Sequence, residues 1–131
     1  MKMLARPALR TLLGAVIGLA ATFAQALEVK PFTPEALAAA QAAGKPVAVH
    51  FHAEWCGTCK QQEKAIAQLQ GDKSLDMLLL VADYDREKEL RKSLRVRSQS
   101  TMVVFRGSTE RARLGGDTSA EKFRTALRAA L

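Results

Sequence analysis

The alternation of apolar and polar residues is clearest at residues 47–52, Val-Ala-Val-His-Phe-His, where it predicts a strand. The two valines and the phenylalanine share one face of this strand, and Ala48, His50 and His52 share the other. Residues 77–82 are continuously apolar, as in a central parallel strand that is buried on both faces. Residues 101–105 predict a further strand, which turns at Gly107-Ser108 into an antiparallel edge strand over residues 110–114. Residues 27–32 predict a short extended segment before all of these.

Helical patterns separate these strands. The run Thr-Pro-Glu at residues 33–35 combines a capping residue, a proline and an acid, and it predicts a helix that ends near Ala43. Residues 59–70 predict a second helix with one apolar stripe, and residues 86–94 predict a charged third helix. The run Thr-Ser-Ala-Glu at residues 118–121 predicts a capping box that opens the final helix. The inward residues of that helix are expected to be Phe123, Ala126, Leu127 and Ala130.

This order of elements predicts the fold class. Strand–helix–strand units followed by a hairpin and a helix imply an α/β fold, with a mixed central sheet of four to five strands and helices on both faces. The chain has 131 residues, which suit one ordinary domain. We find no repeat, low-complexity tract or linker in residues 27–131, and we interpret them as a single domain.

The net charge of +7 raises the question of a nucleic-acid or membrane partner. Three of the bases, Lys2, Arg6 and Arg10, lie in the first ten residues, where no acid stands, so a net charge of +4 remains on the rest. The other bases are scattered among acids, except for a cluster at residues 91–97. We interpret this cluster as a solvated helix end and loop, and we expect a monomer without a nucleic-acid partner.

The first 26 residues have the pattern of a secretory signal peptide. A basic start is followed by an apolar stretch over residues 11–23 and by Ala24-Gln25-Ala26, the small-x-small pattern of a cleavage site. The apolar stretch is shorter than the roughly 20 residues of a stable membrane span, which disfavours an uncleaved anchor. We therefore expect cleavage after Ala26, export to the bacterial periplasm, and a compartment in which a cysteine pair can be oxidised.

The two cysteines of the chain, Cys56 and Cys59, lie in the run Trp-Cys-Gly-Thr-Cys-Lys of residues 55–60. The two-residue spacer lets the sulfur atoms meet. The run stands between the strand of residues 47–52 and the following helix, so Cys56 is expected at or before the first helical turn. The free N–H groups and the dipole of a helix start favour the thiolate, which is the attacking species in thiol–disulfide exchange. Cys59, one turn further on, is expected to be more buried and to resolve the mixed disulfide.

Residues 47–60 resemble the strand and active-site segment of the thioredoxin family almost residue by residue, and the element order extends this resemblance over residues 27–131. The resemblance implies an exported thiol–disulfide oxidoreductase that uses the Cys56–Cys59 dithiol as its redox centre and needs no other cofactor. Its implied partners are protein disulfide substrates and, as electron donor, a membrane-embedded thiol relay. Trp55 is expected to cover the site beside Cys56, Gly57 to admit a partner's backbone, and Thr58 to contribute to the redox poise.

Three positions depart from the family's pattern. Ser100 stands where the family has a cis-proline, in a loop whose backbone holds the substrate strand, so Gln99, Ser100 and Thr101 are candidate binding residues. A non-proline cis bond costs about 2.5–4 kcal/mol, which favours a trans Gln99–Ser100 bond. His50 replaces the family's buried acid, and Val81 replaces its lysine partner. His50 either assists proton transfer at Cys59 or fills the acid's place with a satisfied hydrogen bond. We expect His52 at the surface.

Other uses of the cysteines are also open from the sequence. A passive disulfide between them would close a very small loop and would therefore add little to the stability of the fold. Haem attachment requires a histidine after the second cysteine, where Lys60 stands. The alternative function is a zinc or copper carrier, in which Cys56, Cys59 and a nearby histidine supply three ligands; a closed zinc site would need a fourth from elsewhere. The sequence leaves the direction of electron flow open.

Overall fold

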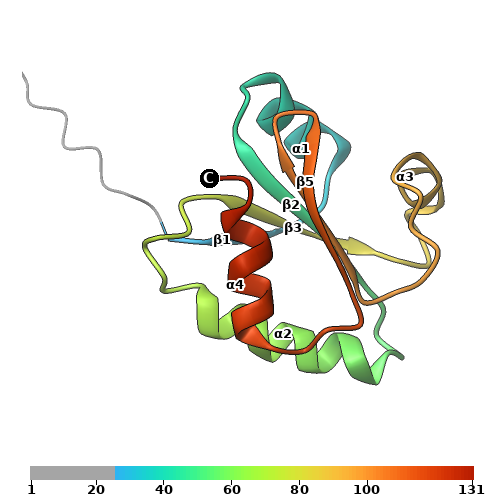
Figure 1. Cartoon of the computed structure of the whole chain (residues 1–131). Helices are drawn as coiled ribbons and strands as arrows, with labels where there is room; N and C mark the ends of the chain where they lie inside the picture. Colours follow the sequence, from blue (N-terminus) through green and yellow to red (C-terminus); the bar gives the residue numbers. More distant parts are fainter. Residues whose placement is uncertain (1–25) are drawn as a thin grey trace, which may run out of the picture.

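The computed structural model of the chain describes residues 26–131. In this part of the chain one mixed sheet contains five strands, which are β1 (Glu28–Pro31), β2 (Pro46–His52), β3 (Leu78–Asp83), β4 (Thr101–Arg106) and β5 (Thr109–Gly115). Their order across the sheet is β1-β3-β2-β4-β5 (Figure 1). β3 is parallel to both of its neighbours, whereas β4 is antiparallel to β2 and β5. The predicted signal peptide lies outside the described residues, apart from Ala26.

Four helices of residues 26–131 cover the two faces of this sheet: α1 (Pro34–Ala42), α2 (Gly57–Leu69), α3 (Lys88–Ser93) and α4 (Ala120–Arg128). α2 and α4 lie side by side on one face (Figure 1). Leu69 of α2 and Phe123 of α4 share a buried core with Ala48 of β2. On the other face, Leu37 of α1 and Leu90 of α3 pack against Phe51 and its neighbours. The predicted α/β class, with helices on both faces, is confirmed. Within residues 26–131 no helix is both long and apolar enough to cross a membrane.

The strand pattern of residues 47–52 fixes which side chains lie under the dithiol. Val47, Val49 and Phe51 join the core beneath α1, whereas Ala48 joins the core beneath α2 and α4. The sheet register pairs His50 with Val81 of β3. The two positions that depart from the family's acid and lysine are therefore direct neighbours in the sheet.

The side-chain cap predicted at Thr33 is present in the structure, whereas the one predicted at Thr118 is not. The Ala36 N–H donates a hydrogen bond of 3.1 Å to the Thr33 side-chain oxygen, so the predicted cap of α1 is present. The predicted capping box at residues 118–121 is wrong. α4 has Ser119 rather than Thr118 as its N-cap, and within the described chain the Ser119 side chain makes no capping hydrogen bond. Glu121 instead forms an ion pair with Arg124 one turn further along the helix.

Candidate active site

The dithiol lies where β2 ends and α2 begins. Cys56 is the N-cap of α2, and the backbone N–H of Cys59 donates a hydrogen bond of 3.0 Å to Cys56 Sγ. The two sulfur atoms form a disulfide, with the Cα atoms 5.2 Å apart. Cys56 is 4% exposed and Cys59 is fully buried. The predicted spacing therefore brings the sulfurs together, with one at the surface rim and the other beneath it.

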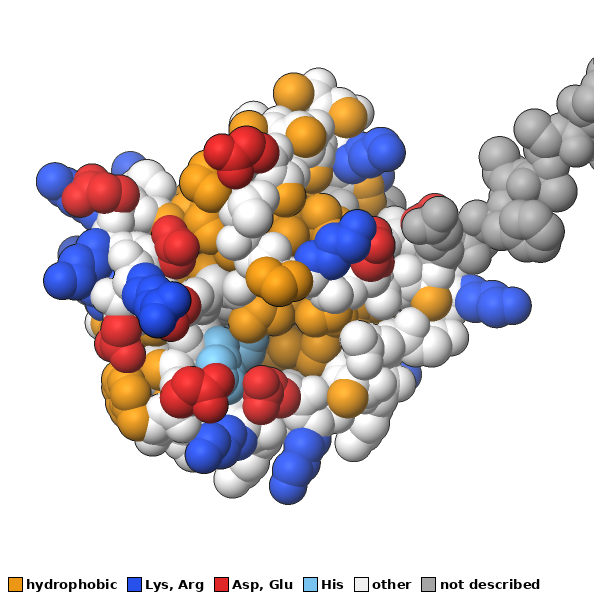
Figure 2. Space-filling model, turned by 180° about the vertical axis from the view of Figure 1, so that it is seen from behind, with side chains coloured by type: hydrophobic (Ala, Val, Ile, Leu, Met, Phe, Trp, Pro, Cys, Tyr) orange, Lys and Arg blue, Asp and Glu red, His pale blue; other side chains and the backbone are white. Residues whose placement is uncertain are grey.

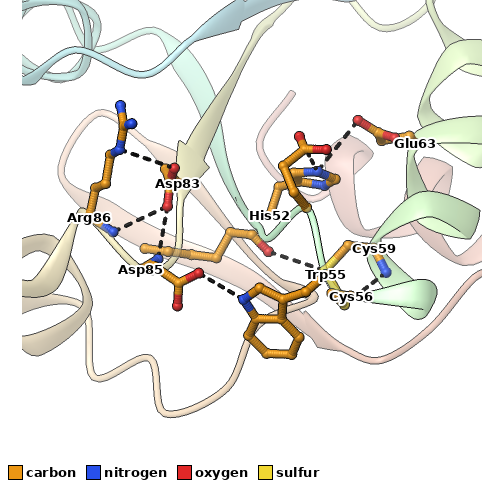
Figure 3. A network of polar contacts seen from close by, with 10 residues as sticks. His52, Trp55, Cys56, Cys59, Glu63, Asp83, Asp85 and Arg86 are labelled. Atoms are coloured by element: carbon orange, nitrogen blue, oxygen red, sulfur yellow. Dashed lines mark hydrogen bonds and ion pairs between the residues drawn. A yellow bond between two sulfur atoms is a disulfide. The ribbon is translucent and has the colours of Figure 1, made fainter.

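The residues around Cys56 form an open rim. Trp55 is 62% exposed, and its indole N–H turns to Asp85, donating a hydrogen bond of 2.8 Å to Oδ2 (Figure 3). Gly57 is exposed, and within the described residues no heavy atom outside its own neighbourhood lies within 4 Å of where a Cβ would stand. Thr58 is half-buried. Exposed neighbours thus flank a Cys56 that is itself only 4% exposed, and Asp85 orients the indole of Trp55.

His52 is buried, and the expectation of a surface residue is wrong: the side chain is packed at the end of β2. Its Nε2 atom lies 3.3 Å from Glu54 Oε1 and 3.8 Å from Glu63 Oε1, so it sits between the loop before Cys56 and the helix after Cys59 (Figure 3). Figure 2 shows the histidine surface on the rear face with acidic side chains beside it. These two acids were not foreseen as part of the site.

The loop opposite the dithiol holds Ser100 in a left-handed backbone conformation, with φ of +55°. Residues 26–131 contain no cis peptide bond, so the Gln99–Ser100 bond is trans, as the sequence favours. The Ser100 N–H donates a hydrogen bond of 2.9 Å to the Phe51 carbonyl, and its hydroxyl donates one of 2.7 Å to the Gln99 carbonyl. The Thr101 hydroxyl donates to the Ser98 carbonyl at 2.9 Å. Side-chain hydroxyls therefore brace this loop where the family has a proline ring.

The Phe51 carbonyl connects this loop to the dithiol. Cys59 Sγ lies 4.0 Å from the same oxygen that accepts the Ser100 N–H. The loop and the inner sulfur therefore share one neighbour on β2. Ser100 and Thr101 are buried beside Phe51 of β2, next to the inner sulfur, whereas Gln99 is half-buried.

His50 is fully buried and bonded to a side chain that sequence reasoning missed. His50 Nε2 and Gln62 Oε1 are 2.7 Å apart. Burial lowers the pKa of His50 from 6.5 to about 4; the hydrogen bond to Gln62 acts in the opposite direction, and the nearby His52 lowers it further. His50 is therefore neutral near pH 7. Its Nδ1 atom has no hydrogen-bond partner in the described part of the chain, and the residue lines a hollow of about 190 Å³ together with Glu63 and Gln70.

A signal for Gln62 was present in the sequence. It lies three residues after Cys59 and precedes Ala65, Ile66 and Leu69 on the same stripe of α2. A polar residue on an apolar helical stripe must find partners in the core, because an unpaired buried amide is costly. Periodicity could therefore have identified Gln62 as a buried polar residue, although not which groups it bonds.

A buried thiol and a rim thiol joined at a helix N-terminus constitute a centre for thiol–disulfide exchange. Backbone N–H groups at the helix start favour a thiolate at Cys56, and Cys59 is placed to attack Cys56 Sγ and release a bound substrate. Within residues 26–131 no group of three or more His, Cys, Asp or Glu side chains is arranged to hold a metal ion. The zinc or copper alternative thus has no ligand group to support it in this region.

Comparison with known proteins agrees with this class. The sequence profile of the family described as Thioredoxin matches residues 28–129. Thioredoxin-1 of Drosophila yakuba is 33% identical over 72 residues, which cover 55% of this chain and 67% of that protein. Thiol:disulfide interchange protein DsbD of Salmonella typhi is 36% identical over 74 residues, covering 52% of this chain and 13% of that protein. The crystal structure of Trxlp from Edwardsiella tarda has a TM-score of 0.72 at 33% identity, covering 76% of this chain and 98% of that one.

The chain belongs to the thioredoxin family. Its fold and its Cys56–Cys59 pair make it a thiol–disulfide oxidoreductase.

Proposed function

We propose that this protein is an exported reductase, which passes electrons from a dithiol donor to the disulfides of other proteins. The observation that supports this function best is the position of Cys56 at the N-cap of α2, where its sulfur accepts the Cys59 N–H. Export rests on the signal pattern of residues 1–26. The DsbD match suggests the class of donor, because that relative is named for thiol:disulfide interchange; we infer a dithiol protein at the membrane.

The proposed cycle begins with both cysteines reduced. The Cys56 thiolate attacks one sulfur of a substrate disulfide, the substrate S–S bond breaks, and the departing substrate thiolate takes up a proton. Cys59 then loses its proton and attacks Cys56 Sγ, which breaks the mixed disulfide and releases the second substrate thiolate, protonated in turn. Two electrons and two protons have passed to the substrate. The donor dithiol reverses these steps on the Cys56–Cys59 disulfide and is itself oxidised.

The surroundings of His50 suit a structural role in this cycle rather than proton transfer. A group with a pKa of about 4 is a weak base near pH 7. Its Nε2 atom is also engaged by Gln62 rather than directed to a sulfur. We therefore assign His50 to the support of the site's floor.

The test is reduction of insulin by dithiothreitol, with wild-type protein and two serine variants. Cys56→Ser should reduce insulin no faster than the uncatalysed reaction, because the attacking sulfur is gone. In a separate reaction, Cys59→Ser that has been reduced and then freed of dithiothreitol should accumulate a mixed disulfide between Cys56 and the substrate, detected by mass. A variant with both cysteines replaced by serine should form none. Insulin reduction by Cys56→Ser at the wild-type rate would contradict the proposal.

Export and oligomeric state need separate measurements. Expression of the whole chain in a bacterium should yield a periplasmic protein whose N-terminal residue is Leu27. Sedimentation should give the mass of a monomer. Retention of residues 1–26 on a cytosolic product would contradict export while leaving the redox activity untouched.

A further inference from the structure

Gln62 joins three separate parts of the site. It lies on α2, three residues after Cys59, and is fully buried. Its Oε1 atom is 2.7 Å from His50 Nε2 on β2. Its Nε2 group donates to the Ser100 carbonyl at 3.0 Å and to the Asp117 carbonyl at 2.7 Å, on the loops before β4 and before α4. One amide therefore connects the active-site helix, the central strand and the loop opposite the dithiol.

The chemistry of the partners fixes the orientation of this amide. Both carbonyls are acceptors, so the NH₂ group of Gln62 must face them. Its oxygen then faces His50, which must donate from Nε2. The low pKa keeps His50 neutral near pH 7, and the contact with the Gln62 oxygen places its one ring proton on Nε2. His50 therefore orients Gln62, and Gln62 directs both of its N–H bonds at the loops.

The loop that receives these bonds needs support. Ser100 has φ of +55°, a left-handed backbone conformation that is unfavourable for residues other than glycine. It is held by its N–H on the Phe51 carbonyl and by its own carbonyl, which accepts bonds from Gln62 and from the Gly116 N–H at 3.0 Å. The Phe51 carbonyl is also the neighbour of Cys59 Sγ. The support therefore acts directly beside the reacting sulfurs.

We propose that Gln62, oriented by His50, is a positioning residue that holds the Ser100 loop against the dithiol and so determines how well a protein disulfide is received. The inference rests on the proposed function, since the loop matters only if a substrate chain lies between it and Cys56. The proposed role of Gln62 predicts different effects on two classes of substrate. An extended protein substrate needs the loop in place, whereas a small organic disulfide needs only access to Cys56.

The test compares Gln62→Met with Ile66→Val. Methionine keeps the length of glutamine but removes its three hydrogen bonds, and Ile66→Val makes a small change one turn along the same helix in the same core. For Gln62→Met we expect KM for insulin to rise about fivefold or more, because a factor of five corresponds to about 1 kcal/mol, the net value of one typical hydrogen bond. The kcat for hydroxyethyl disulfide should stay within about twofold of wild type. Ile66→Val should change neither. Equal losses on both substrates, or no change on insulin, would overturn the inference.

Hydrogen exchange of the wild-type protein keeps the inference testable if Gln62→Met fails to fold. The Ser100 amide should exchange about as slowly as the Val103 amide in the centre of β4. The reason is that Gln62, bonded to the Ser100 carbonyl, stabilises the hydrogen bond from the Ser100 N–H to the Phe51 carbonyl. In Gln62→Glu, which places an oxygen against both carbonyls, the Ser100 amide should exchange at least tenfold faster while that of Val103 changes little. A rapidly exchanging Ser100 amide in the wild type would refute the positioning role.

The two proposals fail in distinguishable ways. If wild-type protein reduces neither insulin nor hydroxyethyl disulfide, the proposed reductase function is wrong, while Ser100 exchange still measures the contact itself. If both disulfides are reduced and Gln62→Met leaves insulin kinetics unchanged, the function stands and the role of Gln62 is wrong.

Discussion

Because His50 is buried and uncharged near pH 7, the stability of the folded protein should depend on pH. Burial lowers the pKa of His50 from 6.5 to about 4, so the unfolded chain binds a proton that the folded chain does not accept until about pH 4. The free energy of unfolding should therefore be highest above about pH 6.5 and should fall as the pH drops towards 4, by up to about 3 kcal/mol. Urea unfolding of the oxidised protein at several pH values in this range measures the effect.

A matched variant separates His50 from other titrating groups. His50→Gln keeps a donor for the Gln62 oxygen but does not titrate, so its stability should vary less between about pH 6.5 and 4. Hydrogen bonds from Ser74, followed by that from Arg124, lower the pKa of Asp72 to about 2. The stabilisation from Asp72 is present above its unfolded pKa of 3.8 and is lost only as the pH falls through about 2, below the window. Equal pH dependence in both proteins would contradict the assignment.

Ser100 is not simply a missing proline. Its φ of +55° is incompatible with a proline ring, and its N–H is bonded to the buried Phe51 carbonyl. Ser100→Pro should therefore lower the free energy of unfolding by at least about 1–3 kcal/mol, the cost of leaving one buried carbonyl unpaired. Ser100→Ala keeps the N–H and should cost less. A proline variant as stable as wild type in urea would show that this loop can adopt another backbone conformation.

At the level of single residues, the sequence predicts the sulfurs better than their surroundings. The spacing of Cys56 and Cys59 brings the two side chains close together, because three residues make nearly one helical turn. By contrast, the hydrogen bonds of Gln62 to Ser100 and Asp117 depend on tertiary packing, because these partners are 38 and 55 positions away from Gln62 in the sequence. The surface position predicted for His52 is wrong for the same reason, because the neighbouring Glu63 belongs to α2 and comes within 3.8 Å of His52 Nε2 only when α2 packs against β2.

At the level of elements, α1 and α4 differ in how they begin. Thr33 accepts a side-chain capping bond, whereas Ser119 within the described chain does not. Thr33→Ala should therefore lower the free energy of unfolding by about 1 kcal/mol, and Ser119→Ala should stay within about 0.5 kcal/mol of wild type. Urea unfolding of both variants measures the difference. A larger loss for Ser119→Ala would mean that its hydroxyl caps α4 in solution.

The elements themselves follow well from the sequence. The alternation of residues 47–52 identifies β2, and the apolar run at 77–82 identifies β3, which lies one residue later as Leu78–Asp83. Both patterns report burial on defined faces, which the sheet provides. The predicted capping box of α4 is wrong because the run at 118–121 fits that motif only locally. In the fold, Asp117 pairs with Lys122 and Glu121 pairs with Arg124.

At the level of the whole molecule, the surroundings of the dithiol predict the direction of its reaction. Strongly oxidising dithiols owe their potential to a stabilised reduced form. Here the described residues provide Cys56 Sγ with one hydrogen bond, from the Cys59 N–H, and the buried His50 carries no charge above about pH 4. Apart from the backbone N–H groups of the helix start, which favour the Cys56 thiolate, the described residues add little that stabilises the reduced form, and we predict a reduction potential nearer to about −270 mV than to about −120 mV.

Equilibration with dithiothreitol and glutathione redox buffers measures this potential. The fluorescence of Trp55, the neighbour of Cys56, reports the fraction of oxidised protein, and Cys56→Ser gives the baseline that no redox buffer should change. A value near −270 mV means that reduced protein can pass electrons to most exposed disulfides, because about 30 mV corresponds to a factor of ten in the exchange equilibrium. A value near about −120 mV would mean that the protein donates disulfides instead, which would reverse the proposed function while leaving the site's residues in the same roles.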